Sequence, residues 1–202
     1  MARTSFAGPV YSEGRPVVTQ DLTTGELVGQ IPIVYPAART AIEAEYRDNA
    51  LQVGGPAVDV PRTVRYGPGG VSLTGIVSVD ANGVITILKD ATIVATTRLR
   101  AQRIGAAGVS IVVVWGERSI DGGLNWTPLP NVSSINLNVE DDTITFYDVI
   151  PARVVIGEKY RIRFARSSDG NNSGDLAPQV LPGGLAFLGV VPSAYLSIYR
   201  FV

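Results

Sequence analysis

The chain has 202 residues, of which 46% are hydrophobic and 17% are charged, and its formal net charge is −1 at pH 7. This composition is typical of a folded globular protein. Because positive and negative charges nearly balance, the chain lacks the excess of basic residues that drives electrostatic binding to nucleic acid or to an anionic membrane. The sequence contains no His and no Cys, which excludes disulfides. Zinc, iron–sulfur and haem sites thereby lose their usual ligands, and the commonest general base is absent. We therefore expect neither an enzyme nor a cofactor.

Residues 1–66 do not have the pattern of an independent domain. Gly and Pro recur in them, for example at Gly8-Pro9, Pro32 and Pro36, and they stop regular structure from propagating. The short apolar pieces between these breaks are typical of side chains that dock singly on a partner. We predict an extended N-terminal arm over residues 1–66. Its predicted contact residues are Phe6, Val10, Tyr11, Ile31, Ile33, Tyr35, Ile42 and Tyr46.

One short helix is predicted within the arm, over residues 37–51. Pro36 suits a first helical turn, and Ile42, Tyr46 and Ala50 recur at intervals of four along one helix face. Two alternatives to a docked arm are a partly disordered leader and a set of extra strands that complete the sheet of the following domain.

Residues 67–202 follow a break at Gly67-Pro68-Gly69-Gly70 and have the pattern of one compact domain. Short stretches with strand patterns recur along them, and turns such as Asn82-Gly83, a strong hairpin signal, join them. About eight antiparallel strands in roughly 130 residues are typical of a sandwich. The sequence predicts an all-β domain, a jelly-roll-like antiparallel β-sandwich.

Alternation of side chains along single strands predicts which faces are buried. In residues 158–165, Ile162 and Phe164 fall on one face, while Arg161 and Arg163 fall on the other. The last predicted strand, residues 194–202, carries large apolar side chains on both faces, so it needs the core on one side and a subunit interface on the other. The predicted trimer-interface residues are Tyr195, Tyr199 and Phe201.

Residues 181–192 are apolar but broken by Gly and Pro, so they cannot form one regular core strand. An apolar loop of this kind normally lies against another surface. We predict a second interface element here, and the alternative is an internal loop folded over the domain.

Residues 119–126 match the Asp-box pattern Ser-x-Asp-x-Gly-x-x-Trp, with Ser119, Asp121, Gly123 and Trp126 at its positions. The pattern resembles the repeats of sialidase-type propellers, which need several copies. One copy in a chain of this length favours a plain hairpin turn, in which the carboxylate accepts turn amides and Gly supplies a positive φ.

A weak calcium candidate is formed by Asp169, Asn171, Ser173 and Asp175, whose oxygen side chains alternate as in the first half of a calcium loop. Val180 stands where the bidentate Glu of such a loop is expected. A polar surface loop is therefore the favoured interpretation.

Other polar and aromatic residues do not predict catalysis. The run Glu140-Asp141-Asp142 with Asp148 lacks the fixed separation of two carboxyls that glycoside cleavage requires, since adjacent residues of a turn point in different directions. Trp115, Trp126 and Tyr147 have the chemistry to stack on sugar rings, but aromatics in strand patterns are more often core residues.

A resemblance to a known class of proteins rests on both halves of the chain. The opening Arg3-Thr4-Ser5-Phe6-Ala7-Gly8-Pro9-Val10-Tyr11-Ser12 is similar to the N-terminal segments of structural proteins of tailed bacteriophages. The β domain with its aromatic last strand resembles the jelly-roll trimers of capsid decoration (cement) proteins and head fibres. The resemblance implies a trimer on the capsid surface of a virion, with the major capsid protein as partner and with arms that cross neighbouring capsomers. It implies no catalytic residues.

The expected function is therefore that of a structural virion protein that decorates and stabilises a phage capsid as a homotrimer. The alternative is a glycan- or receptor-binding domain of a phage head or tail fibre, with a host-surface glycan as its partner. A glycan-hydrolysing enzyme comes third.

Overall fold

The structure is a computed structural model that describes residues 10–12, 15–20, 27–28, 41–67, 71–72, 75–105, 108–139 and 143–201. The chain divides into two compact units, Met1–Ala38 and Arg39–Val202. In the first unit, a three-stranded antiparallel sheet is formed by β1 (Val10–Ser12), β2 (Arg15–Gln20) and β3 (Leu27–Val28), in the order β1-β2-β3. The predicted arm thus contains a small sheet of its own.

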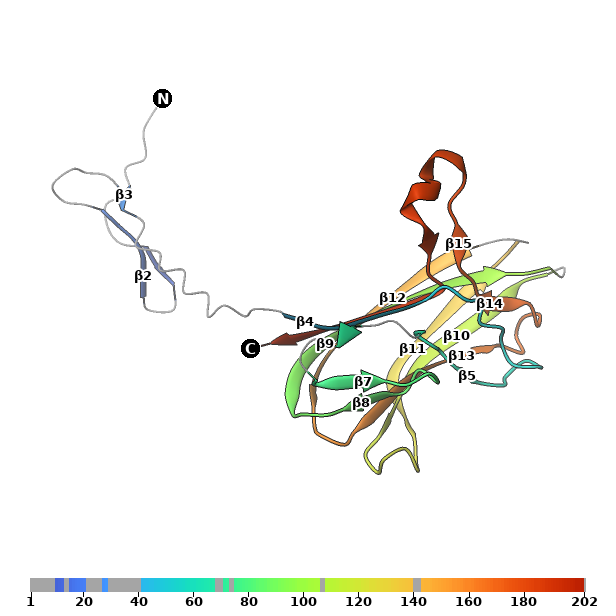
Figure 1. The fold of residues 1–202 in the computed structure, drawn as a ribbon, viewed down its shortest axis with the longest axis horizontal. Coiled ribbons are helices and arrows are strands. Elements are labelled where there is room, and N and C mark those ends of the chain that lie inside the picture. The colour runs from blue at the N-terminus through green and yellow to red at the C-terminus, as the bar shows by residue number, and fades with distance from the viewer. Residues whose placement is uncertain are drawn as a thin grey trace. The chain divides into compact units, whose positions relative to one another are not determined.

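The second unit contains two six-stranded antiparallel sheets (Figure 1). The β10 sheet has the order β11-β10-β13-β8-β7, and β5 also pairs with β13. Its strands are β5 (Arg62–Thr63), β7 (Val77–Val79), β8 (Ile85–Ile87), β10 (Ser110–Ser119), β11 (Thr127–Leu137) and β13 (Lys159–Arg166).

The β9 sheet has the order β12-β9-β17-β4-β6, and β14 also pairs with β9. Its strands are β4 (Ala41–Asp48), β6 (Val71–Ser72), β9 (Ala91–Arg103), β12 (Thr143–Val154), β14 (Gly174–Leu176) and β17 (Ala194–Phe201). A hairpin of β15 (Gln179–Val180), the 3-10 helix η1 (Gly183–Leu188) and β16 (Val190–Val191) projects from the sheets in Figure 1.

The core lies between the two sheets. Side chains along each strand point alternately into this core and away from it. Val112 and Phe164 from the β10 sheet, and Leu99, Leu196 and Ile198 from the β9 sheet, are almost fully buried in one cluster. The predicted all-β class is confirmed, with antiparallel sheets as in a β-sandwich. The predicted alternation of β13 is also confirmed, because Ile162 and Phe164 are buried while Arg161 and Arg163 lie on the opposite face.

The predicted helix over residues 37–51 is wrong, because residues 41–48 form strand β4, which pairs with β17. Ala44, Tyr46 and Asp48 are buried, and Glu45 and Arg47 between them are exposed, so the burial has the period of a strand. A spacing of four fits one helix face and one strand face equally well. Residues 41–48 form a strand and not a helix because the backbone N–H and C=O groups along the edge of β17 need hydrogen-bond partners, which β4 supplies.

The compact unit consequently begins at Arg39 and not at Gly67. Val64 and Tyr66 are fully buried, and the Tyr66 hydroxyl lies 3.2 Å from the Thr97 hydroxyl of β9. The Gln52 side chain pairs with the Arg65 backbone, donating to its carbonyl and accepting from its N–H at 2.8 Å each. Residues 41–66 therefore complete the sandwich, which is the extra-strand alternative to a docked arm.

Candidate interaction site

The candidate interaction site is the outer face of the β9 sheet. Strand register places Tyr147, Arg98 and Tyr195 in one row across β12, β9 and β17. Because Leu196 and Ile198 point into the core, their neighbours in β17 point to the opposite face. We define the outer face by Val94, Thr96, Arg98, Tyr147, Val149, Tyr195, Ser197 and Tyr199.

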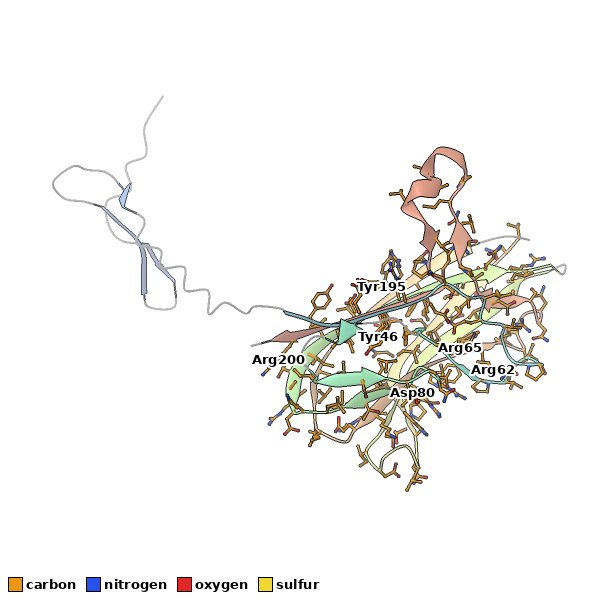
Figure 2. All side chains as sticks on the ribbon, in the orientation of Figure 1. Tyr46, Arg62, Arg65, Asp80, Tyr195 and Arg200 are labelled. Carbon is orange, nitrogen blue, oxygen red and sulfur yellow. The ribbon has the colours of Figure 1, made fainter. Side chains whose placement is uncertain are left out.

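The outer face exposes large apolar side chains. Tyr147 is 63% exposed and Val149 is 58% exposed, although both belong to a strand whose other face contributes to the sandwich. The guanidinium carbon of Arg98 lies 5.2 Å from the ring centroid of Tyr195, a cation–π contact that places this charge against an aromatic ring. Tyr195 is labelled in Figure 2. Contiguous exposed apolar surface on a sheet marks an interaction site.

Two of the three predicted trimer-interface residues lie on this outer face. Tyr195 and Tyr199 are both half-buried there. The backbone of Phe201 pairs with Thr92 at the end of β17, and its side chain lies outside the described residues. The trimer itself stays a prediction.

The predicted arm contacts are distributed over both units. Val10 and Tyr11 belong to β1 and Ile42 belongs to β4, where the backbone alone is described. Tyr46 packs in the core of the second unit, so its side chain cannot contact another protein there. The other four predicted contacts, Phe6, Ile31, Ile33 and Tyr35, lie outside the described residues.

The projecting hairpin of β15, η1 and β16 also exposes apolar side chains. Val180 is 76% exposed and Leu188 is 61% exposed. Its tip closes through bonds from Leu185 N to Pro182 O (3.1 Å) and from Gly189 N to Ala186 O (3.0 Å). This segment was predicted to be an interface element, and the structure shows that it does not fold over its own sandwich.

The weak calcium candidate contains a carboxylate that is already engaged. Asp175 Oδ1 lies 2.5 Å from Arg166 Nη2 and accepts the Gly54 N–H at 2.7 Å, and both charged side chains are buried. Asn171 and Ser173 hydrogen-bond to each other. Among the described residues, no cluster of three or more Asp and Glu side chains is placed to hold a metal ion.

The Asp-box motif forms a turn between β10 and β11. Asp121 accepts the Asn125 N–H at 2.9 Å and the Ser119 hydroxyl at 2.7 Å, and these bonds hold the pKa of Asp121 well below its usual value. Ser119 Oγ in turn accepts the Gly123 N–H, and Trp126 Nε1 donates to Gly123 O. The carboxylate therefore stabilises the turn, as the turn interpretation predicted.

A charged and aromatic cluster lies on the outer face of the β10 sheet. Glu117 accepts from Trp115 Nε1 at 3.0 Å and from Arg161 Nε at 2.6 Å. Arg161 covers the ring of Trp126, with its guanidinium carbon 3.9 Å from the centroid. Sequence reasoning missed this cluster because Glu117 and Arg161 are 44 positions apart, and only the pairing of β10 with β13 makes them neighbours.

Glu158, which directly precedes β13, forms a second buried polar cluster. Burial alone would raise its pKa, but the Tyr160 hydroxyl at 2.6 Å and the ion pair with Arg118 outweigh burial, and the pKa of Glu158 is lowered. Burial, and then the bond to Glu158, raise the pKa of Tyr160. The cluster joins β10 to β13 and fixes the turn at Val155, whose N–H also bonds to Glu158.

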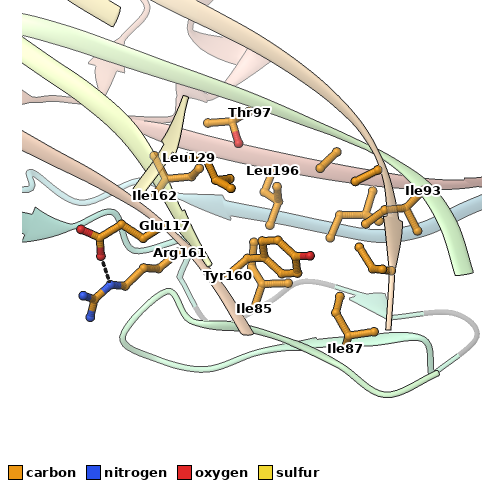
Figure 3. A pocket seen from close by; sticks show the side chains of 14 residues that line it. Ile85, Ile87, Ile93, Thr97, Glu117, Leu129, Tyr160, Arg161, Ile162 and Leu196 are labelled. Atoms are coloured by element: carbon orange, nitrogen blue, oxygen red, sulfur yellow. Dashed lines mark hydrogen bonds and ion pairs between the residues drawn. The ribbon is translucent and has the colours of Figure 1, made fainter. Parts of the chain in front are cut away.

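A space between the two sheets measures about 50 Å³ (Figure 3). Ile85, Ile93, Ile162 and Leu196 line it from both sides. A space of this size is a packing defect rather than a substrate pocket, because ligand pockets measure roughly 300–1,000 Å³. In the part of the chain that the structure describes, no helix is long and apolar enough to cross a membrane.

Comparison of the sequence with models of known protein families and with curated proteins found no match. The functional argument therefore rests on the surfaces described above.

Proposed function

We propose that the protein is a structural subunit that self-associates through the outer face of the β9 sheet and contacts a second assembly protein through its N-terminal unit. The observation that carries the proposal is the exposure of Tyr147 and Val149 beside Tyr195 on one continuous face. Burying such a face against another subunit removes apolar surface from water, at roughly 25 cal/mol per Å².

The assembly we propose is the head of a tailed bacteriophage, with the chain as a trimeric decoration protein. Support comes from the resemblance of residues 3–12 and of the aromatic last strand to such proteins. Three N-terminal units per trimer would bind neighbouring capsomers together, so that each weak contact gains from multivalency.

The glycan-binding alternative receives less support from the geometry. Trp126 donates its ring N–H to Gly123 O, and Arg161 covers one face of its ring. A sugar that stacks on Trp126 from that side would have to displace Arg161 from both the ring and Glu117.

Two measurements test the proposal. Sedimentation equilibrium of the full chain is expected to give a mass three times 21.4 kDa, and a monomer at micromolar concentration would contradict it. Co-sedimentation with undecorated phage heads is expected for the full chain and lost when residues 1–38 are deleted. The deletion must end there because Ala44, Tyr46, Val64 and Tyr66 belong to the core.

A further inference from the structure

The projecting hairpin has an unusual composition for a solvent-exposed element. Residues 176–199 contain no charged residue, and they include the whole hairpin and most of β17. Within the hairpin, Val180, Leu185 and Leu188 are each more than half exposed. Exposed apolar surface without interspersed charge is rare on a monomer and marks an interaction.

The hairpin is a formed element rather than an open loop. Gln179 pairs with Val191 and Val180 pairs with Val190, and the tip has its own backbone bonds. An added Cβ at Gly183 or Gly189 would meet no atom within 4 Å, so the space around the tip is open. The backbone therefore holds the apolar side chains out into solvent.

The outer face of the β9 sheet also exposes apolar side chains. It is a broad strand surface, and its exposed members Tyr147 and Val149 lie on β12. The central row carries two charges: Arg98 is placed over the ring of Tyr195, and Arg47 of β4, which pairs with Tyr195, is exposed at the far side of the row. Each chain thus carries one apolar projection and, on the β12 side of the outer face, one exposed apolar strip.

We propose that the hairpin of one copy packs on the outer face of the β9 sheet of the next copy. The inference deepens the proposed function and rests on it. A contact between two different patches is heterologous, and repetition around an axis closes it into a ring in which every hairpin and every face is covered. A second copy of the chain is the occupant we infer, because each copy supplies one hairpin and one outer face, so that every hairpin finds a face.

A lipid bilayer is the competing apolar partner. Segments that bind anionic membranes usually carry Lys or Arg beside their apolar residues. Residues 176–199 carry neither, so the observations favour a protein face.

Cysteine cross-linking tests the contact directly, because the natural chain has no Cys. Leu188→Cys protein is mixed with Val149→Cys protein and oxidised. The expected product is a disulfide between the two different variants, and a chain that carries both changes should give a ladder that ends at the closed ring. Leu124→Cys is the matched control, since Leu124 is 84% exposed and lies on the turn between β10 and β11. Equal cross-linking of Leu124→Cys to Val149→Cys, or Val149-to-Val149 products alone, would overturn the proposal.

A charge in the hairpin provides the equilibrium test. Leu188→Asp is expected to raise the dissociation constant of the oligomer at least about thirtyfold, the range of an interface hot spot, whereas Leu124→Asp leaves it unchanged. Both proteins should keep the thermal midpoint of the monomeric fold, because both positions are exposed. If the Leu188→Asp protein still forms the oligomer, the hairpin contact is refuted but the proposed function is not. If the natural chain is a monomer, both are refuted. Binding to phosphatidylcholine–phosphatidylglycerol vesicles that Leu188→Asp abolishes would assign the hairpin to membranes instead.

Discussion

Arg166 and Asp175 form a buried ion pair, with 2.5 Å between Nη2 and Oδ1. Arg166 also donates to the carbonyls of Gly174 (2.8 Å) and Gly55 (3.2 Å), and Asp175 accepts the Gly54 N–H. The pair therefore ties Gly54 and Gly55 to the end of β13 and to β14. A loop that resembles a calcium site in sequence is stabilised by a guanidinium instead.

Arg166→Met is expected to lower the free energy of unfolding by about 3–5 kcal/mol, because it leaves the Asp175 charge buried and unpaired. Urea denaturation measures the change. Arg62→Met, at an exposed position, serves as the control and should change stability by less than about 0.5 kcal/mol. Equal effects of the two substitutions would show that the ion pair is not important for stability.

Because of the core cavity, we expect an Ala→Val substitution to raise the stability of the fold at one position of β9 and to lower it at another. Ala95 lines the cavity, so Ala95→Val should fill it and stabilise the fold by about 0.5–2 kcal/mol. Ala101 is fully buried and does not line the cavity, so Ala101→Val should cost about 1–3 kcal/mol through overpacking. Thermal unfolding distinguishes them, and a loss of stability in both would mean that the space is not available to a side chain.

Gly83 is required where the turn between β7 and β8 approaches another segment. Its φ is +80°, and an added Cβ would lie 1.8 Å from the carbonyl oxygen of Val64. Gly83→Ala should therefore cost about 3 kcal/mol or more. Gly75→Ala is the matched control, because its φ of +66° is equally unfavourable but its surroundings are open. The control should cost about 1–2 kcal/mol, and a similar loss for both variants would refute the clash.

The lowered pKa of Glu158 predicts that the stability of the fold depends on pH. Its folded-state pKa lies below the ordinary value of 4.5, so the unfolded chain binds more protons between the two values. The stabilisation is therefore present above pH 4.5 and is lost as pH falls through the folded-state pKa. The difference in thermal midpoint between the natural chain and Glu158→Gln should be largest at pH 7 and should shrink below pH 4.5. A constant difference for Glu158→Gln would contradict the lowered pKa.

Local patterns predicted those features that depend on neighbours in the sequence. The Asn82-Gly83 hairpin, the Asp-box turn and the two faces of β13 all follow from backbone preference and from alternation within a few residues. The helix prediction failed for the same reason, because the spacing of Ile42 and Tyr46 is compatible with either period and only the partner strand distinguished them.

The candidate site could be predicted in part. Tyr195 and Tyr199 were identified from a strand with two apolar faces, whereas Tyr147 and Val149 were not, because their place beside β9 depends on a pairing across more than forty positions. The sequence also indicated that residues 181–192 need a contact, but not that they project as a hairpin.

By itself, the sequence determined the all-β class, the turns and the alternation of strand faces, since these depend on local geometry and on the hydrophobic period. Only the tertiary structure decided that residues 41–66 belong to the sandwich, that Arg166 pairs with Asp175, and that Tyr147 and Val149 are exposed on the outer face of the β9 sheet. These outcomes depend on contacts between residues that are far apart in the sequence. Strand edges and buried charges need partners, and the fold that pairs them leaves the fewest buried polar groups without a hydrogen bond.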